Sequence, residues 1–102
     1  MILVNRIFSK EKSTKINDGT IRKAVNDWSK NAEKAQCKYG HISKWDTSEV
    51  TTMSKLFYKN SCFNAPINDW DVSKVKTMEE MFYNASSFNQ DISNWDVSNV
   101  TN

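Results

Sequence analysis

Two cysteines and a single histidine are the side chains of this chain best suited to nucleophilic or metal chemistry. Cys37 and Cys62 are 25 residues apart, and His41 has no second histidine or nucleophile at a defined spacing. Two thiols and one histidine do not make a tetrahedral ligand set, and a lone histidine makes no catalytic constellation. We therefore expect no catalytic, cofactor-binding or metal site, and predict that the protein is not an enzyme.

The equal spacing of the two cysteines leaves two interpretations open. If residues 37–40 follow the path of a repeat, the Cα atoms of Cys37 and Cys62 would lie about 5 Å apart, within disulfide range. Alternatively, both are buried small side chains that fill equivalent positions. We prefer the second interpretation, because nothing in the sequence places the chain in an oxidising compartment.

Three aspartates, Asp46, Asp71 and Asp96, are also spaced by 25 residues. Stacked above one another, they would form a column of like charges that a hard cation such as calcium could neutralise. Each is followed two residues later by a serine, however, and an aspartate in this position can cap a turn through backbone N–H groups. Such bonds also keep a carboxylate ionised, so the sequence favours turn capping over a calcium site.

The same spacing extends through most of residues 42–100 and is the dominant signal in the chain. It relates apolar as well as polar positions, for example Ile42/Ile67/Ile92, Trp45/Trp70/Trp95, Val50/Val75/Val100, Met53/Met78, Phe57/Phe82 and Phe63/Phe88. A period of 25 lies within the range of leucine-rich repeats. Repeats of this size bury a continuous core only by stacking on their neighbours.

Each copy contains two apolar patterns that predict secondary structure. Met78, Met81, Phe82 and Ala85 have helical spacing, and Thr77 precedes Glu80 by three residues, as in a capping box. The stretch "SFNQDISNW" places Phe88 and Ile92 as buried candidates among polar neighbours, which indicates a short extended segment. We therefore predict an α/β fold: a short leucine-rich-repeat-like solenoid of strand, turn and short helix.

The N-terminal part has a different pattern. Ile21, Ala24, Val25, Trp28, Ala32 and Ala35 form a helical stripe, and Asp18 or Thr20 could cap its start. We predict a lead-in segment at 1–16, an N-terminal helical cap at 17–40, and the solenoid at 41–102. The solenoid consists of copies at 41–65 and 66–90 and a partial copy at 91–102.

The repeat resembles a known family. The segment "WDVSKVKTMEEMFYNASSFNQDISNW", with the upstream "IRKAVNDW" and "YGHISKWDTSEVTTMSKLF", is similar to the 25-residue repeat of BspA-like leucine-rich-repeat surface proteins, over roughly residues 20–102. Related repeats occur in bacterial lipoproteins, unicellular eukaryotes and large DNA viruses. The resemblance implies adhesion or protein binding without catalysis, and it implies no cofactor and no catalytic residue.

Side chains beside the isoleucine of each copy are the candidates for partner recognition. They differ from copy to copy while the apolar positions stay constant, as expected of a constant scaffold that carries changeable surface residues. This predicted partner-binding face consists of His41, Ser43, Pro66, Asn68, Asp91 and Ser93.

The charge distribution and the hydropathy of the chain limit which classes of partner we expect. Residues 1–44 carry ten Lys/Arg against four Asp/Glu, whereas residues 45–102 carry four against eight. Acidic residues interrupt the basic half and no nucleic-acid motif accompanies it, so a basic-helix nucleic-acid-associated protein is the third-ranked hypothesis and no nucleic-acid partner is expected. No apolar run approaches the length of a transmembrane helix, and no signal peptide is visible.

We expect a non-enzymatic repeat scaffold or protein–protein interaction module, with an adhesin-type fragment on a cell or virion surface as the alternative. The localisation is unknown, since only the resemblance suggests a surface. The third copy stops before its predicted helix, at "SNVTN". We therefore expect its open rung to be completed by another molecule, by self-association, or by further repeats of a longer array.

Overall fold

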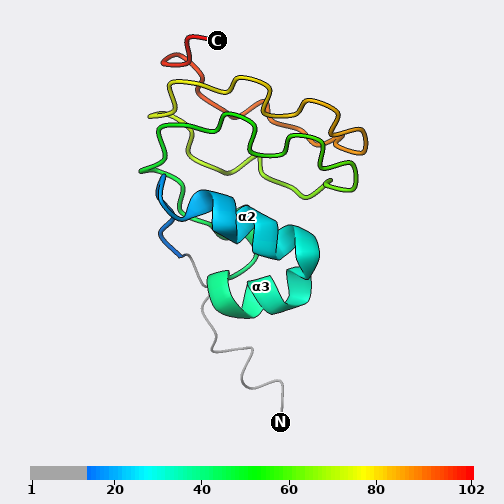
Figure 1. The fold of residues 1–102 in the computed structure, drawn as a ribbon. Coiled ribbons are helices and arrows are strands. Elements are labelled where there is room, and N and C mark those ends of the chain that lie inside the picture. The colour runs from blue at the N-terminus through cyan, green and yellow to red at the C-terminus, as the bar shows by residue number, and fades with distance from the viewer. Residues whose placement is uncertain (1–13) are drawn as a thin grey trace.

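The computed structural model describes residues 14–102. Its helices are α2 (Ile21–Lys30) and α3 (Ala32–Tyr39), followed by the short 3₁₀ turn η1 (Ile42–Lys44). The two helices lie at one end, and residues 45–102 wind through irregular loops that lie one above the other toward the C-terminus (Figure 1). No helix of the described part is long and apolar enough to cross a membrane.

The helical N-terminal part forms two helices instead of one continuous stripe. In α2, Ile21, Ala24 and Val25 are buried, as the apolar stripe predicts. Asn31 is extended, with φ of −159°, so it ends α2, and its side chain caps α3 by accepting a hydrogen bond from the Lys34 N–H at 3.1 Å. Because the chain changes direction at Asn31, Ala32 is exposed and does not continue the stripe.

Asp18 links the start of α2 to the first copy of the repeat. Its carboxylate accepts hydrogen bonds from the Thr51 N–H at 2.8 Å and the Thr51 hydroxyl at 2.6 Å. Thr20 occupies the N-cap position of α2 but makes no side-chain capping bond. Asp18 therefore holds α2 against the repeats instead of capping the helix.

The predicted α/β leucine-rich-repeat-like solenoid is wrong. Within residues 14–102 both α-helices precede the first copy, and no strand or sheet is present. The only β-type pairings of this part are single bridges, Lys15 with Asp46 and Thr52 with Thr77. The copies consist of turns and irregular chain.

Left-handed residues explain why the predicted helix at 77–85 does not form. Glu80 and Asn84 have positive φ angles of 54° and 55°, and their counterparts Lys55 and Lys59 have 58° and 57°. A right-handed helix cannot contain such residues. Because a left-handed residue recurs at every fourth position, each of these segments forms a series of tight turns.

The backbone of these turns bonds to the neighbouring copy. The N–H groups of alternate residues donate, at 2.7–2.9 Å, to carbonyls of the following copy: Lys55 to Glu79, Phe57 to Met81, and Lys59 to Tyr83. The N–H groups between them close local turns on the carbonyl three positions earlier. Hydrogen bonds that would lie inside a helix are thus exchanged for bonds between copies.

Side chains at equivalent positions of successive copies lie against one another in the core. The rings of Trp45 and Trp70 stack with centroids 6.1 Å apart, and those of Phe57 and Phe82 stack at 5.5 Å. The shared environments that the repeat predicts for these side chains are therefore observed, although the backbone that holds them is neither helix nor strand.

Candidate protein-binding site

His41 and Ser43, the first two residues of the predicted partner-binding face, stabilise a turn. His41 and Ser43 flank the fully buried Ile42. The His41 Nδ1 accepts a hydrogen bond from the Ser43 N–H at 3.1 Å, and the imidazole meets the Trp28 ring edge-on at a centroid distance of 5.2 Å. This histidine therefore has a structural role at the junction of the helices and the first copy.

The remaining residues of this face have mixed roles. The Asp91 carboxylate accepts a hydrogen bond from the Ser93 N–H at 2.9 Å, which lowers the pKa of Asp91. Asn68 accepts a hydrogen bond from the Asn94 N–H at 3.0 Å and so ties the second copy to the third. Pro66 is exposed. Partner recognition by these side chains stays a prediction.

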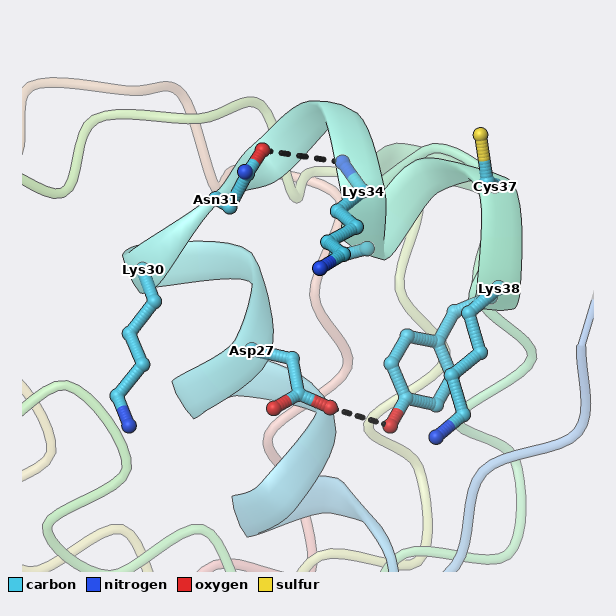
Figure 2. A pocket seen from close by; sticks show the side chains of 8 residues that line it. Asp27, Lys30, Asn31, Lys34, Cys37 and Lys38 are labelled. Atoms are coloured by element: carbon cyan, nitrogen blue, oxygen red, sulfur yellow. Dashed lines mark hydrogen bonds between the residues drawn. The ribbon is translucent and has the colours of Figure 1, made fainter.

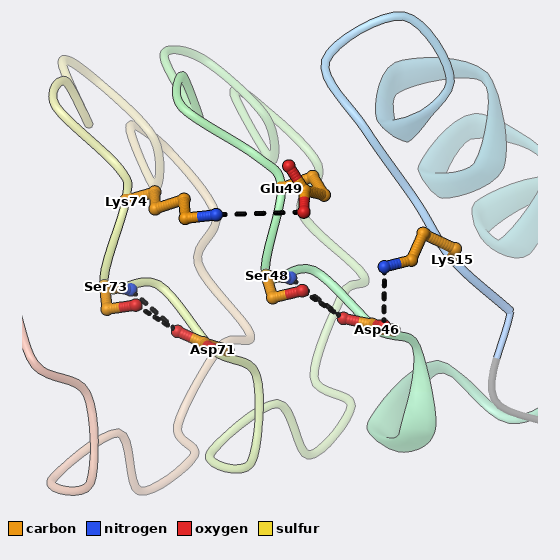
Figure 3. A network of polar contacts seen from close by, with 7 residues as sticks. All are labelled: Lys15, Asp46, Ser48, Glu49, Asp71, Ser73 and Lys74. Atoms are coloured by element: carbon orange, nitrogen blue, oxygen red, sulfur yellow. Dashed lines mark hydrogen bonds and ion pairs between the residues drawn. The ribbon is translucent and has the colours of Figure 1, made fainter.

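The three regularly spaced aspartates cap turns, as predicted. In the first two copies the carboxylates of Asp46 and Asp71 accept hydrogen bonds from the N–H and the hydroxyl of Ser48 and Ser73, with hydroxyl distances of 2.6 Å (Figure 3). Asp96 accepts the N–H of the serine two positions later in the same way. The hydroxyl and then the N–H of each serine hold the pKa of all three carboxyls below the ordinary value.

Basic side chains flank the aspartate column. Lys15 lies 3.5 Å from the Asp46 carboxylate, and Lys74 lies 3.7 Å from Glu49 (Figure 3). All four groups are partly or largely exposed, so each pair contributes little to stability. Among residues 14–102, no three His, Cys, Asp or Glu side chains gather closely enough to hold a metal ion.

A hollow of about 540 Å³ lies beside α2 and α3 (Figure 2). At its edge the Tyr39 hydroxyl donates a hydrogen bond of 2.7 Å to Asp27, which also pairs with Lys23 at 3.1 Å. This contact lowers the pKa of Asp27 and raises the pKa of Tyr39. The rim also carries Lys30, Asn31, Lys34, Cys37 and Lys38. No sequence pattern predicts this hollow, because it depends on the break between the helices at Asn31.

Both cysteines are exposed free thiols. The preferred interpretation, two buried side chains in equivalent positions, is therefore wrong, and the structure contains no bond between them. Cys37 belongs to α3, outside the path of the repeat, so the regular spacing does not place it above Cys62.

The last copy exposes apolar side chains whose counterparts are buried. Ile92 is 36% exposed and Val97 is 48% exposed, whereas Ile67 and Val72 are 0% and 1% exposed. We use the name C-terminal face for these two exposed side chains of the last copy together with the half-buried Phe82. Single exposed apolar side chains are common on monomeric proteins, whereas larger contiguous apolar patches mark interaction sites.

The repeat pattern predicts this surface only in part. An open last rung follows from it, but the prediction that Ile92 is buried is wrong. Val97 could have been recognised from the regular alignment of Thr47, Val72 and Val97 along the chain.

Residues 4–102 match a protein family described as "Mycoplasma protein of unknown function, DUF285". No curated protein and no solved structure matches the chain.

Proposed function

Because the chain belongs to the DUF285 family of Mycoplasma proteins of unknown function, we propose its function from its surface: it is a non-enzymatic protein-binding module whose partner docks on the C-terminal face. The observation that carries this proposal is the exposure of Ile92 and Val97, since the positions equivalent to them are covered wherever another copy follows.

Burial of these side chains would provide binding energy. Because Ile92 is 36% exposed and Val97 is 48% exposed, covering the rest of each side chain stabilises a complex by about 0.5–1.5 kcal/mol, before the costs of association are subtracted. The resemblance of the repeat to BspA-like surface proteins also supports a binding role. The same resemblance favours one alternative function, adhesion by a fragment displayed on a cell or virion surface.

The chemistry-bearing side chains support a role without catalysis. The single histidine, His41, uses its Nδ1 to hold a turn, and Asp46 and Asp71 use their carboxylates in the same way. A group committed to local backbone bonds is poorly placed to transfer a proton to a substrate.

A cross-linking experiment tests the proposal. A photoreactive amino acid is placed at Val97, or at the exposed Gln36 of α3 as the control, and each protein is irradiated in an extract of the organism that encodes it. We expect a protein that is captured from position 97 only. The purified partner should then bind Val97→Asp at least about tenfold more weakly than the unchanged chain.

The matched control for this affinity is Gln36→Glu, which adds the same negative charge on the opposite part of the molecule and should leave the affinity unchanged. If no purified protein binds with an affinity that depends on Val97, the proposed function is wrong.

A further inference from the structure

The break between the two helices brings three lysines around one hollow. Lys30 is the last residue of α2, and Lys34 and Lys38 belong to α3. All three border the hollow of about 540 Å³ beside these helices (Figure 2). In one continuous helix they would follow each other along one outer face. Because Asn31 is extended and the chain changes direction there, the lysines instead border the hollow from two helices.

The lining of this hollow carries an excess of positive charge. Three lysines against one acidic residue, Asp27, leave a formal excess of two positive charges. The Asp27 carboxylate is already engaged, since it accepts a hydrogen bond from the Tyr39 hydroxyl at 2.7 Å and pairs with Lys23 at 3.1 Å. Within residues 14–102, no carboxylate forms an ion pair with Lys30 or Lys34.

An excess of one charge around a hollow has a direct physical consequence. The three ammonium groups repel one another, and water and salt screen this repulsion only in part. Charges of one sign that border a hollow also raise the local concentration of ions of the opposite sign. An anion that enters between the lysines removes repulsion and adds attraction, so the lining favours a negatively charged ligand.

The wall of the hollow is less polar than its rim. Ala35 is 3% exposed, and the half-buried Tyr39 ring meets Trp45 edge-on at a centroid distance of 5.7 Å. The lysine side chains add apolar stems below their ammonium groups. The volume of about 540 Å³ lies in the range of small-molecule sites, about 300–1,000 Å³. The hollow therefore has room for an organic group beside an anion.

We propose that this hollow binds an organic phosphate monoester. Such a group carries a charge of about −1.5 to −2 at pH 7 and three strong acceptor oxygens, which matches the excess of positive charge. Lys30, Lys34 and Lys38 donate hydrogen bonds to the phosphate. The organic group lies against Ala35 and the ring of Tyr39. A monocarboxylate would leave one positive charge of the lining without a counter-charge.

This site goes beyond protein binding by the C-terminal face. Its lining residues all belong to α2, α3 and the residue between them, and none belongs to the last copy of the repeat. A phosphate monoester can therefore bind whether or not a protein partner depends on Val97, and either proposal can fail without the other.

Titration of the full chain with phenyl phosphate tests the site. Calorimetry measures the affinity, and the shifts of backbone amides in NMR spectra locate the ligand. We expect phenyl phosphate to bind at least about tenfold more tightly than inorganic phosphate, because its ring is buried against the wall. Benzoate, which carries the same ring and a single charge, should bind at least about fivefold more weakly than phenyl phosphate. The largest shifts should occur at Lys34, Ala35 and Lys38.

Three variants change the charge in defined places. Lys34→Gln removes one ammonium group and should weaken phenyl phosphate binding at least about fivefold. Asp27→Asn should have the opposite effect, because it removes the negative charge of the lining while the asparagine oxygen still accepts the Tyr39 hydroxyl. The matched control is Lys76→Gln, at an exposed position of the second copy, which should leave the affinity unchanged.

Several outcomes would overturn the proposal. Equal weakening in Lys34→Gln and Lys76→Gln would show that only the net charge of the chain matters. Benzoate or inorganic phosphate that binds as tightly as phenyl phosphate would reject the assigned ligand. Amide shifts centred outside α2 and α3, or no measurable binding of phenyl phosphate, would reject the site itself.

Discussion

At the scale of single residues, the indole N–H groups of the repeated tryptophans join consecutive segments of the chain. Trp45 donates to the Gly40 carbonyl at 3.0 Å, and Trp70 and Trp95 donate to isoleucine carbonyls of the preceding copy. Each bond adds about 1 kcal/mol of net stability, but a buried carbonyl left without its donor costs about 1–3 kcal/mol. The tryptophans therefore contribute both apolar area and an obligatory hydrogen bond.

The substitution Trp70→Phe tests this role. Phenylalanine keeps an aromatic ring but removes the donor to Ile42 and leaves a small cavity, so we expect the free energy of unfolding to fall by about 3 kcal/mol. Urea denaturation followed by circular dichroism measures it. Trp28→Phe is the control, because Trp28 is half-buried and its indole N–H makes no hydrogen bond within residues 14–102. If the two variants lose the same free energy of unfolding, the proposed role of the Trp70 hydrogen bond is wrong.

At the scale of elements, left-handed residues decide the backbone of each copy. Lys55, Lys59, Glu80 and Asn84 occupy a region of φ that costs a non-glycine residue about 1 kcal/mol. The bonds between copies offset this cost, because each turn frees alternate N–H groups to reach the next copy. The apolar face of Met53, Leu56 and Phe57 has helical spacing and is buried without any helix.

Glycine should be accepted at these left-handed positions. We expect Lys59→Gly to raise the free energy of unfolding by about 0.5 kcal/mol, since glycine removes the strain and the lost contact of Lys59 with the Tyr58 ring is weak. Glu79→Gly, at an exposed position without positive φ, should instead lower it by about 0.5–1 kcal/mol. Chemical denaturation of both variants measures the difference, and a loss of stability at position 59 would argue against the left-handed turn.

At the scale of the whole molecule, hydrogen-bonded aspartates make stability sensitive to acid. The pKa values of Asp18, Asp27, Asp46, Asp71, Asp91 and Asp96 are all lowered from the ordinary value of 3.8, chiefly by donors from neighbouring side chains or backbone N–H groups. A carboxyl with a lowered pKa in the folded state stabilises the fold above its unfolded pKa, and loses this contribution as the pH falls through the folded value.

We therefore expect a stability that is nearly constant from pH 7 to about pH 5 and that falls steeply below about pH 4. Asp71→Asn should flatten part of this fall and change stability at pH 7 only slightly, because asparagine keeps an oxygen that accepts the Ser73 N–H but does not titrate. Urea unfolding at pH 7, 5 and 3 measures both curves. An unchanged acid slope in the variant would show that Asp71 does not contribute.

Which positions share an environment can be read from the amino-acid sequence alone. Its regular spacing identified the stacked pairs Trp45/Trp70 and Phe57/Phe82, the turn-capping role of Asp46, Asp71 and Asp96, and the helical character of residues 21–30. These features follow from side-chain type and local spacing, and both can be read along one chain.

The backbone conformation of the copies and the identity of the uncovered surfaces, by contrast, depend on contacts between segments far apart in the sequence. Apolar residues three and four apart suit a helix, but they suit turns with a left-handed residue at every fourth position equally well. The choice depends on whether an N–H finds its acceptor four positions back or in the neighbouring copy, as Phe57 finds the Met81 carbonyl. The exposure of Ile92 and Val97 likewise depends on what lies beyond the third copy, so no periodicity within a copy reveals it.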